Sequence, residues 1–313
     1  MTPSRPLPFA NKAQIMTTKK ADDPRTGQHG RRLSGGIIER MLLALASGLI
    51  LTGCASATLD EAGHLRSYAD LRQDNGLLTK SLVSIDKPRV LAARTINIVP
   101  TAFASVPDAS FTLEQRGLVA NAVDRSLCEG LSERFTVVSL SEPADLTVHA
   151  TITHASPTSK IAAGLSKGAS VASVVLLPEV PVPVPRIPFG LGSLSVEAEA
   201  SDLVGQQRAA MVWARGANAL TDPGPIADNG DAYTLAGAFG GDFSSLLVTG
   251  ASPFQGGLDL PSMQAIGTYF GKQPKYAACK AFGRNPGVIG TIGNVVGAPP
   301  NWSDGGASLS GGT

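Results

Sequence analysis

Cys54 is the residue whose type and surroundings most directly indicate chemistry. It follows Leu51, Thr52 and Gly53 at the end of an uncharged run, Met41–Gly53, that reads MLLALASGLILTG. A cysteine thiolate is a nucleophile, and alkylation of its sulfur with a diacylglyceryl group would give a thioether. The small residues Thr52 and Gly53 would let a peptidase cleave just before Cys54. The freed amine would then accept a further acyl chain.

Residues 1–53 have the layout of a secretory signal. Arg31, Arg32 and Arg40 precede the apolar run, as a basic n-region precedes an h-region. The run is shorter than the about 20 residues that span a bilayer. It ends in a tetrapeptide, Leu51–Cys54, that resembles the lipobox of bacterial lipoproteins. Because two or more acyl chains anchor a protein stably, we predict N-acyl and S-diacylglycerol groups on Cys54 and no other cofactor.

The residues around the signal also bear on export and sorting. Ala55, rather than Asp, follows the anchor, and by resemblance to enterobacterial sorting this favours the outer membrane, facing the periplasm. Arg31-Arg32 would suit twin-arginine export, but Leu33-Ser34-Gly35 fits that signal poorly, so we favour the general route. Translation from Met16 would keep the basic n-region.

Charge excludes several classes of protein. The chain has 26 basic and 25 acidic residues, of which residues 1–53 hold 8 and 3, so the mature chain has a net charge of −4. Charged residues make up 16%, against about 25% in an average soluble domain. The chain is too apolar to be wholly disordered and lacks the basic excess of a nucleic-acid binder. We therefore predict attachment to the membrane through the acyl chains and no nucleic-acid partner.

Hydrophobic periodicity predicts an α+β domain with an antiparallel sheet and helices packed on one face. Thr112 and Gln115 suit a capping box that opens a helix ending near Phe135. A second helix over 232–248 contains three glycines that weaken it. The predicted strands are 95–99, 135–140, 145–154, 193–202 and 207–216, the last two forming a hairpin.

The same reading divides the chain into segments. Residues 1–53 form the signal peptide with its long polar extension, and 54–90 the lipid anchor and tether. Residues 91–250 form the α+β domain, interrupted by an apolar and Pro-rich insertion at 161–192. Residues 251–313 form a C-terminal extension that is Gly-rich and is expected to be disordered from about 284, with Asp304 as the only charged side chain after Asn285.

Two motifs of the mature chain carry a family resemblance. They are Gly63-x-Leu65-x-x-Tyr68-x-x-Leu71 and the hairpin run from Ser195 to Asp202, followed by Gly205 and Ala209-Ala210. With the lipobox cysteine, they resemble bacterial lipoproteins grouped as domain of unknown function 3313, over about Cys54 to Val248. The resemblance implies an envelope lipoprotein and supplies no catalytic residues.

The remaining polar residues suggest no catalytic or metal site. His149 and His154 lie five residues apart on one predicted strand, which places them on opposite faces, so they would not share a metal ion. Glu197 and Glu199 share one face of a strand and could act as an acid–base pair, but we expect a solvated polar face. No HExxH, paired CxxC or P-loop motif is present. We therefore predict that the protein is not an enzyme.

Two cysteines remain after the anchor. An exported protein meets an oxidising compartment, so Cys128 and Cys279 could form a disulfide that closes a loop of roughly 150 residues, worth about 4–5 kcal/mol. The alternative is two buried free thiols.

Three functions stay open. The first is a non-enzymatic, outer-membrane-anchored lipoprotein that binds or stabilises an envelope partner protein. The second is a carrier of lipid or a small apolar ligand, using the apolar residues 161–177, and the third is a cell-wall hydrolase. The insertion 161–192 would enter the membrane, dock a partner or cover one side of the sheet.

Overall fold

The computed structural model describes residues 57–59, 61–104, 111–159, 191–218, 229–255, 270, 273–283, 285–287 and 304. The chain separates into two units, Met1–Gly48 and Leu49–Thr313, and all described residues belong to the second. The predicted signal peptide, its Leu51–Cys54 motif and most of the insertion 161–192 lie outside the described residues.

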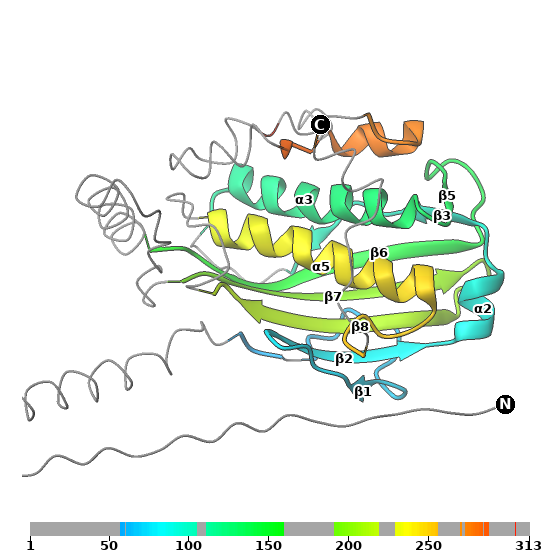
Figure 1. The fold of residues 1–313 in the computed structure, drawn as a ribbon, viewed down its shortest axis with the longest axis horizontal. Helices are drawn as coiled ribbons and strands as arrows, with labels where there is room; N and C mark the ends of the chain where they lie inside the picture. Colours follow the sequence, from blue (N-terminus) through cyan, green and yellow to red (C-terminus); the bar gives the residue numbers. More distant parts are fainter. Residues whose placement is uncertain are drawn as a thin grey trace, which may run out of the picture. The chain divides into compact units, whose positions relative to one another are not determined.

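The centre of the fold is an eight-stranded sheet in the order β1-β2-β8-β7-β6-β3-β5, with β4 also paired to β6 (Figure 1). The three long central strands and β2 pair antiparallel, whereas β3 pairs parallel with β5 and β6, and β4 pairs parallel with β6. The strands are β1 (Arg72–Gln73), β2 (Thr79–Ile85), β3 (Thr95–Ile98), β4 (Ala102–Phe103), β5 (Thr136–Val137), β6 (Leu146–Ser156), β7 (Ser193–Asp202) and β8 (Gln207–Gly216).

The predicted α+β class is confirmed, and the sheet is mixed rather than wholly antiparallel. The reason is the helix between β3 and β5, because a strand–helix–strand crossover brings the two strands into parallel pairing. That helix is α3 (Leu113–Leu131), and it begins with the predicted capping box between Thr112 and Gln115. The predicted hairpin is also present, as β7 and β8.

The described residues of the predicted tether, 57–59 and 61–90, are part of the folded domain. Strand β2 pairs with β8 along its whole length, from Thr79 opposite Arg215 to Ile85 opposite Ala209. Helix α2 (Lys87–Ala92) follows it directly. The prediction failed because two of the buried positions of β2 are the small polar residues Thr79 and Ser81. The strand therefore lacks a clear alternation of hydrophobic and polar residues.

Helices α3 and α5 (Gly230–Thr249) lie side by side over one face of the sheet (Figure 1). The side chains between them and the strands form the main core. Trp213 of β8 lies edge-on to Phe239 of α5 and donates its indole N–H to Asp242 at 2.8 Å. The core-facing residues Val196, Ala198 and Ala200 of β7 are those that the sequence alternation predicted.

The two helices approach closely where each has a glycine opposite a serine. A Cβ atom at Gly240 would lie 2.5 Å from Cβ of Ser126, and one at Gly130 would lie 2.5 Å from Cβ of Ser244. The glycine in α5 is therefore needed for helix packing, although it lowers helix propensity.

We expect Gly240→Ala to lower the free energy of unfolding by about 1–3 kcal/mol, because it overpacks the helix contact. The control is Gly237→Ala, where a Cβ atom would meet nothing within 4 Å, and which should raise stability by about 0.5–1 kcal/mol. Urea denaturation of both variants measures the difference. Equal effects of the two substitutions would show that the close approach does not limit packing.

Candidate functional site

The polar face of the sheet, opposite the helices, is covered by residues 57–59 and 61–71, which we call the arm. Glu197 and Glu199 of β7 lie beneath it and are 1% and 4% exposed. The prediction of a solvated polar face here is therefore wrong. The sequence pattern of β7 was read correctly, but it does not reveal that another segment covers that face.

Both carboxylates are held by donors from the arm. Glu197 accepts the backbone N–H groups of Ala62 (2.6 Å, at Oε1) and His64 (2.8 Å, at Oε2). Glu199 accepts both the backbone N–H and the Nε–H of Arg66, each at 2.8 Å. We call Glu197, Glu199 and these contacts the arm site. Its alternate backbone donors show that the arm lies extended along β7.

Tyr68 completes the arm site. Its hydroxyl donates to Oε2 of Glu197 at 2.7 Å and accepts the N–H groups of Gly63 and Leu65. Burial, followed by the hydrogen bond and charge of Glu197, raises the pKa of Tyr68. The structure therefore joins the two motifs that carried the family resemblance, Gly63-x-Leu65-x-x-Tyr68 and the hairpin run of β7.

The two ends of the arm are also held. At its start, Lys80 donates Nζ–H to the carbonyl of Ala57, and Ser195 donates its hydroxyl to the carbonyl of Thr58. Toward the other end, Arg66 donates to the carbonyl of Gly205. A second apolar cluster lies under the arm, formed by Leu65, Leu71, Ala210 and Val212, with Leu59, Tyr68 and Leu82 packed against it.

The two carboxylates are placed to bind the arm rather than to carry out acid–base chemistry. Every carboxylate oxygen of Glu197 and Glu199 already accepts a hydrogen bond from the arm. A general acid or base must instead reach the proton of a substrate. The arm site thus fixes the chain that follows residue 54 onto the domain.

We expect Glu197→Gln with Glu199→Gln to release the arm while the sheet stays folded. Each amide nitrogen would face an N–H donor, and an unsatisfied buried donor costs about 1–3 kcal/mol. Amide hydrogen exchange at Ala62, His64 and Arg66 should accelerate by about 10-fold or more. The control is Glu61→Gln, an exposed carboxylate of the same segment. Unchanged exchange in the double variant would contradict the role of the arm site.

The two strand histidines lie on the same face, which corrects the prediction. The register of β6 shifts between Ile152 and His154, so His149 stands opposite Glu199 and His154 opposite Ser195. A β-bulge turns the following residues to the other face. Burial lowers the pKa of His149. Among the described residues, no three His, Cys, Asp or Glu side chains are grouped to hold a metal ion.

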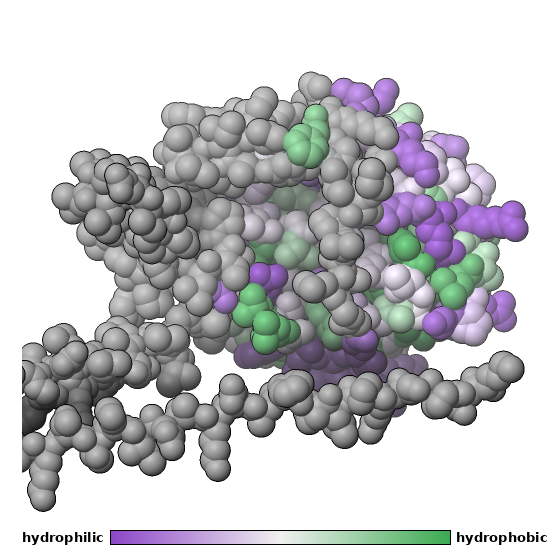
Figure 2. Space-filling view, in the orientation of Figure 1, coloured by the Kyte–Doolittle hydropathy of each residue, from purple (hydrophilic) through white to green (hydrophobic). Residues whose placement is uncertain are grey.

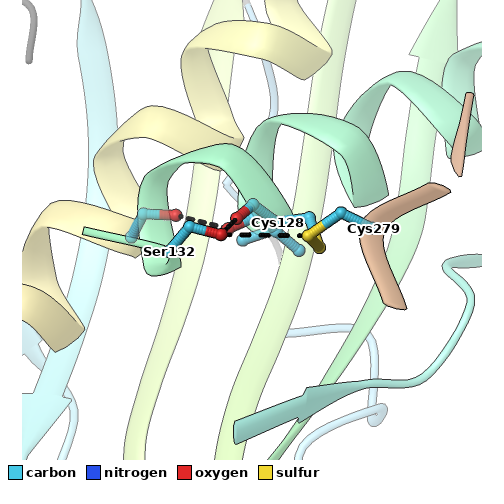
Figure 3. Close-up of a disulfide and its surroundings, with 5 residues drawn as sticks. Cys128, Ser132 and Cys279 are labelled. Carbon is cyan, nitrogen blue, oxygen red and sulfur yellow. Dashed lines mark hydrogen bonds between the residues drawn. A yellow bond between two sulfur atoms is a disulfide. The ribbon is translucent and has the colours of Figure 1, made fainter. Parts of the chain in front are cut away.

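Cys128 of α3 and Cys279 form a disulfide (Figure 3). Cys279 belongs to the 3-10 helix η2 (Ala277–Phe282), and the two Cα atoms are 5.7 Å apart. Both cysteines are buried, and the hydroxyl of Ser132 lies 3.8 Å from Sγ of Cys279. The bond fixes a segment far along the chain to the outer side of α3.

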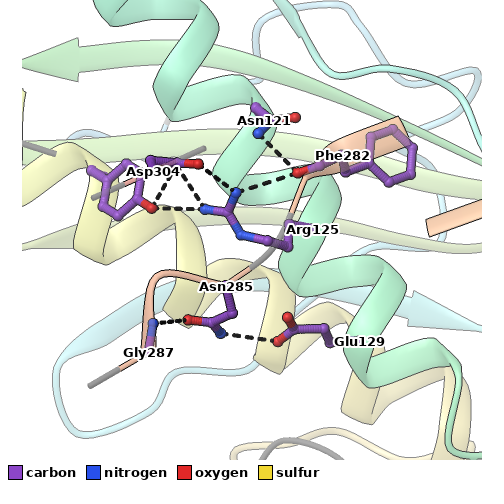
Figure 4. A network of polar contacts seen from close by, with 8 residues as sticks. Asn121, Arg125, Glu129, Phe282, Asn285, Gly287 and Asp304 are labelled. Carbon is purple, nitrogen blue, oxygen red and sulfur yellow. Dashed lines mark hydrogen bonds and ion pairs between the residues drawn. The ribbon is translucent and has the colours of Figure 1, made fainter. Parts of the chain in front are cut away.

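A stripe of α3 side chains binds the C-terminal residues around this disulfide (Figure 4). Asn121 donates to the carbonyl of Phe282 at 3.0 Å, and Asn285 donates to Glu129 at 3.2 Å. Lys275 donates to the carbonyl of Ser132 at 2.9 Å. The stripe consists of Asn121, Arg125, Cys128 and Glu129, and it is continued by Ser132, the C-cap of α3.

Asp304 makes a buried ion pair with Arg125 of α3. Arg125 donates to both carboxylate oxygens, at 3.0 and 2.9 Å, and the two side chains are 7% and 0% exposed. Tyr233 of α5 donates its hydroxyl to Asp304 at 2.7 Å. The predicted disorder from about residue 284 is therefore wrong at Asn285 and Asp304. The sequence signal for this contact was Asp304 itself, the only charged residue after Asn285. A charge is buried only when it is paired, so a buried Asp304 requires a cation such as Arg125.

Asp124 of α3 is a second buried carboxylate, 3% exposed. It accepts the N–H of Thr101 at 3.0 Å and its hydroxyl at 2.6 Å. Burial raises the pKa of Asp124 to about 7, against the opposing effects of Thr101 and Arg125. Asp124 thus fixes α3 to the residue that precedes β4.

We expect stability to depend on pH through Asp124. The folded state keeps its proton up to about pH 7, whereas the unfolded chain releases it near pH 4. Stability from this group is therefore complete below about pH 4 and is lost as the pH rises to about 7. Asp124→Asn should flatten that decline, measured as the urea midpoint from pH 4 to 8.

Asp145 provides a control of opposite sign. The N–H groups of Arg94 and Thr95 lower the pKa of Asp145. Its contribution is present above the ordinary aspartate pKa and is lost on acidification. Asp145→Asn should therefore reduce stability at neutral pH, and a similar pH profile for the two variants would contradict these assignments.

A family model described as protein of unknown function (DUF3313) matches residues 60–243. The chain belongs to this family. The matched residues run from the arm into α5, so the DUF3313 region contains the whole arm site and most of the α3–α5 contact. It ends before the C-terminal residues that the disulfide and Asp304 attach to α3.

Structural comparison finds PelC of Paraburkholderia phytofirmans. Two crystal forms of the PelC dodecamer align over 57% of this chain, with TM-scores of 0.29 and 0.30, at 11% and 10% identity and with 95% and 96% of the PelC chain covered. None of the curated proteins matches the chain. Within the described residues, no helix has the length and hydropathy needed to cross a bilayer.

Proposed function

We propose that this protein is a non-enzymatic lipoprotein of the cell envelope. Lipids on Cys54 would anchor it in the outer membrane, facing the periplasm, where it binds or stabilises an envelope partner protein. The sequence supports the anchor through the basic flank, the apolar run and the small residues before Cys54.

One structural observation carries the proposal further. Ala57, the third residue after Cys54, is 5% exposed, and its carbonyl accepts a hydrogen bond from Lys80. The chain thus passes directly from the proposed anchor into the arm. Two buried carboxylates hold the segment that directly follows the anchor. This supports a protein that is held in a fixed orientation at a membrane.

Crosslinking in intact cells tests the partner. Cells producing the wild-type chain or Cys54→Ser at equal levels are treated with a short crosslinker, and the protein is recovered under denaturing conditions. We expect one envelope protein to be trapped reproducibly with the wild type and to be depleted with Cys54→Ser. Failure to trap any reproducible partner with the wild type would contradict the proposal.

A further inference from the structure

The arm begins at one end of the sheet, which we call the anchor end. Ala57 and Thr58 contact Lys80 and Ser195 there. Strand β8 ends at the same place, since Ala214 stands opposite both Lys80 and Ser195. This end lies at the left in Figure 1. The opposite end, with the β7–β8 turn at Leu203–Gln206, is the turn end.

Chain length limits how far the anchor end can lie from a lipid on Cys54. Only Ala55 and Ser56 separate Cys54 from the buried Ala57. Three residues of fully extended chain span at most about 10 Å. The limit applies because the arm site and Lys80 hold the arm in place. A free arm would instead add every residue up to Leu71 to the connection.

The turn end cannot occupy the same position. Leu203 lies eight residues beyond Ser195 along β7 and the turn, which is about 25 Å at the rise of a strand. The connection from Cys54 is too short to cover that distance. The short connection therefore keeps the anchor end, and not the turn end, next to the lipids on Cys54.

The anchor end also has suitable side chains. Leu77, in the turn before β2, is 99% exposed. Lys80 is exposed three residues later, and Arg215 stands opposite Thr79. Strand β6 ends and β7 begins here, at Ser156 and Ser193. An exposed apolar side chain flanked by basic groups matches a bilayer interface, where phosphates attract cations and apolar groups reach the acyl boundary.

Elsewhere, exposed apolar residues are scattered. Figure 2 shows hydrophilic and apolar side chains interspersed over the described surface seen from this side. Leu113 belongs to α3 and Leu140 follows β5, and single exposed apolar residues are ordinary. Leu203 and Val204 are adjacent, 72% and 79% exposed. They are the alternative surface for membrane contact, but they lie at the turn end, beyond the reach of the short connection from Cys54.

We propose that the anchor end of the sheet contacts the phospholipid bilayer, with Leu77 and Lys80 at the headgroup layer and the turn end directed away from the membrane. The proposal rests on the proposed function, because it requires lipid on Cys54. It adds an orientation, in which the long strands extend away from the bilayer. The arm acts as a rigid connection rather than as a tether.

Energy transfer to labelled lipids tests this orientation. Full-length lipidated protein is reconstituted into vesicles of phosphatidylethanolamine and phosphatidylglycerol that contain an acceptor on the headgroup. A donor is attached to His154→Cys at the anchor end or to Val204→Cys at the turn end. The native disulfide and the lipidated Cys54 leave the introduced cysteine as the reactive thiol. We expect transfer to be several-fold more efficient from position 154.

The arm site supplies a second variant. Combining each label with Glu197→Gln and Glu199→Gln should release the arm, lengthen the connection and remove most of the difference between the two positions. Glu61→Gln should leave the difference unchanged. Persistence of the full difference in the released variant would show that the arm does not set the orientation.

The outcomes separate the two proposals. Vesicle binding of the wild type that equals that of Cys54→Ser would contradict the lipid anchor and hence the proposed function. Binding that depends on Cys54, with equal transfer from both positions or stronger transfer from position 204, would overturn the orientation alone.

Discussion

Replacing both Cys128 and Cys279 with alanine is expected to lower the free energy of unfolding by about 5 kcal/mol. The two residues are separated by 151 positions, so the disulfide removes a large part of the conformational entropy of the unfolded chain. Alanine is the suitable replacement because both side chains are buried and contact apolar neighbours. Urea denaturation of the oxidised wild type and the double variant gives the difference.

Reduction of the wild type provides the matched control. If the effect comes from the unfolded chain, reduced wild type and the double alanine variant should have similar midpoints. An effect below about 1 kcal/mol for the double variant would mean that the loop adds little to stability, contrary to the chain-entropy account.

Removing either partner of the Arg125–Asp304 pair is expected to cost about 3–5 kcal/mol, because the other charge would remain buried without compensation. Arg125→Ala and Asp304→Ala should therefore be similarly destabilising. Tyr233 bonds both groups, at 2.7 Å each, so Tyr233→Phe should have a smaller effect of about 1 kcal/mol. Thermal and urea unfolding of the oxidised protein measure all three variants.

A double-mutant cycle identifies the cause. Arg125→Ala combined with Asp304→Ala removes both charges and should cost clearly less than the sum of the two single losses. Lys280→Ala, an exposed cation of η2, should stay within about 0.5 kcal/mol of the wild type. Additive losses in the double variant would contradict a direct ion pair.

These two interactions attach the described C-terminal residues, 273–283, 285–287 and 304, to the folded domain. The disulfide and the ion pair both act on α3, which also lies against the sheet and α5. The arm covers the opposite face of the sheet and lies almost wholly within the DUF3313 region, whereas the C-terminal contacts come from residues beyond that region. The arm fixes the side nearest the proposed anchor, and the C-terminal residues stabilise the helical layer.

The sequence predicted the features whose signals are local. The period of α3, its capping box and the alternation of β6, β7 and β8 can each be read within a short window, and all are present. The helix predicted between the strands that became β3 and β5 also indicates that these two strands pair in parallel.

The contacts that make the candidate site are not local. Ala62 is 135 residues from Glu197, and Arg125 is 179 residues from Asp304. Alternation shows that Glu197 and Glu199 share a face, but it does not show whether water or another segment meets that face. The bulge in β6, which moves His154 to the side of His149, has no composition signal in this sequence.

The most direct test of the account is lipid attachment at Cys54. Cells producing the full chain are grown with labelled palmitate, and the protein is purified under denaturing conditions. Cys128→Ala with Cys279→Ala serves as a control that retains Cys54. We predict label in the wild type and in this control, and none in Cys54→Ser. Label in Cys54→Ser, or its absence from the wild type, would contradict the lipoprotein account.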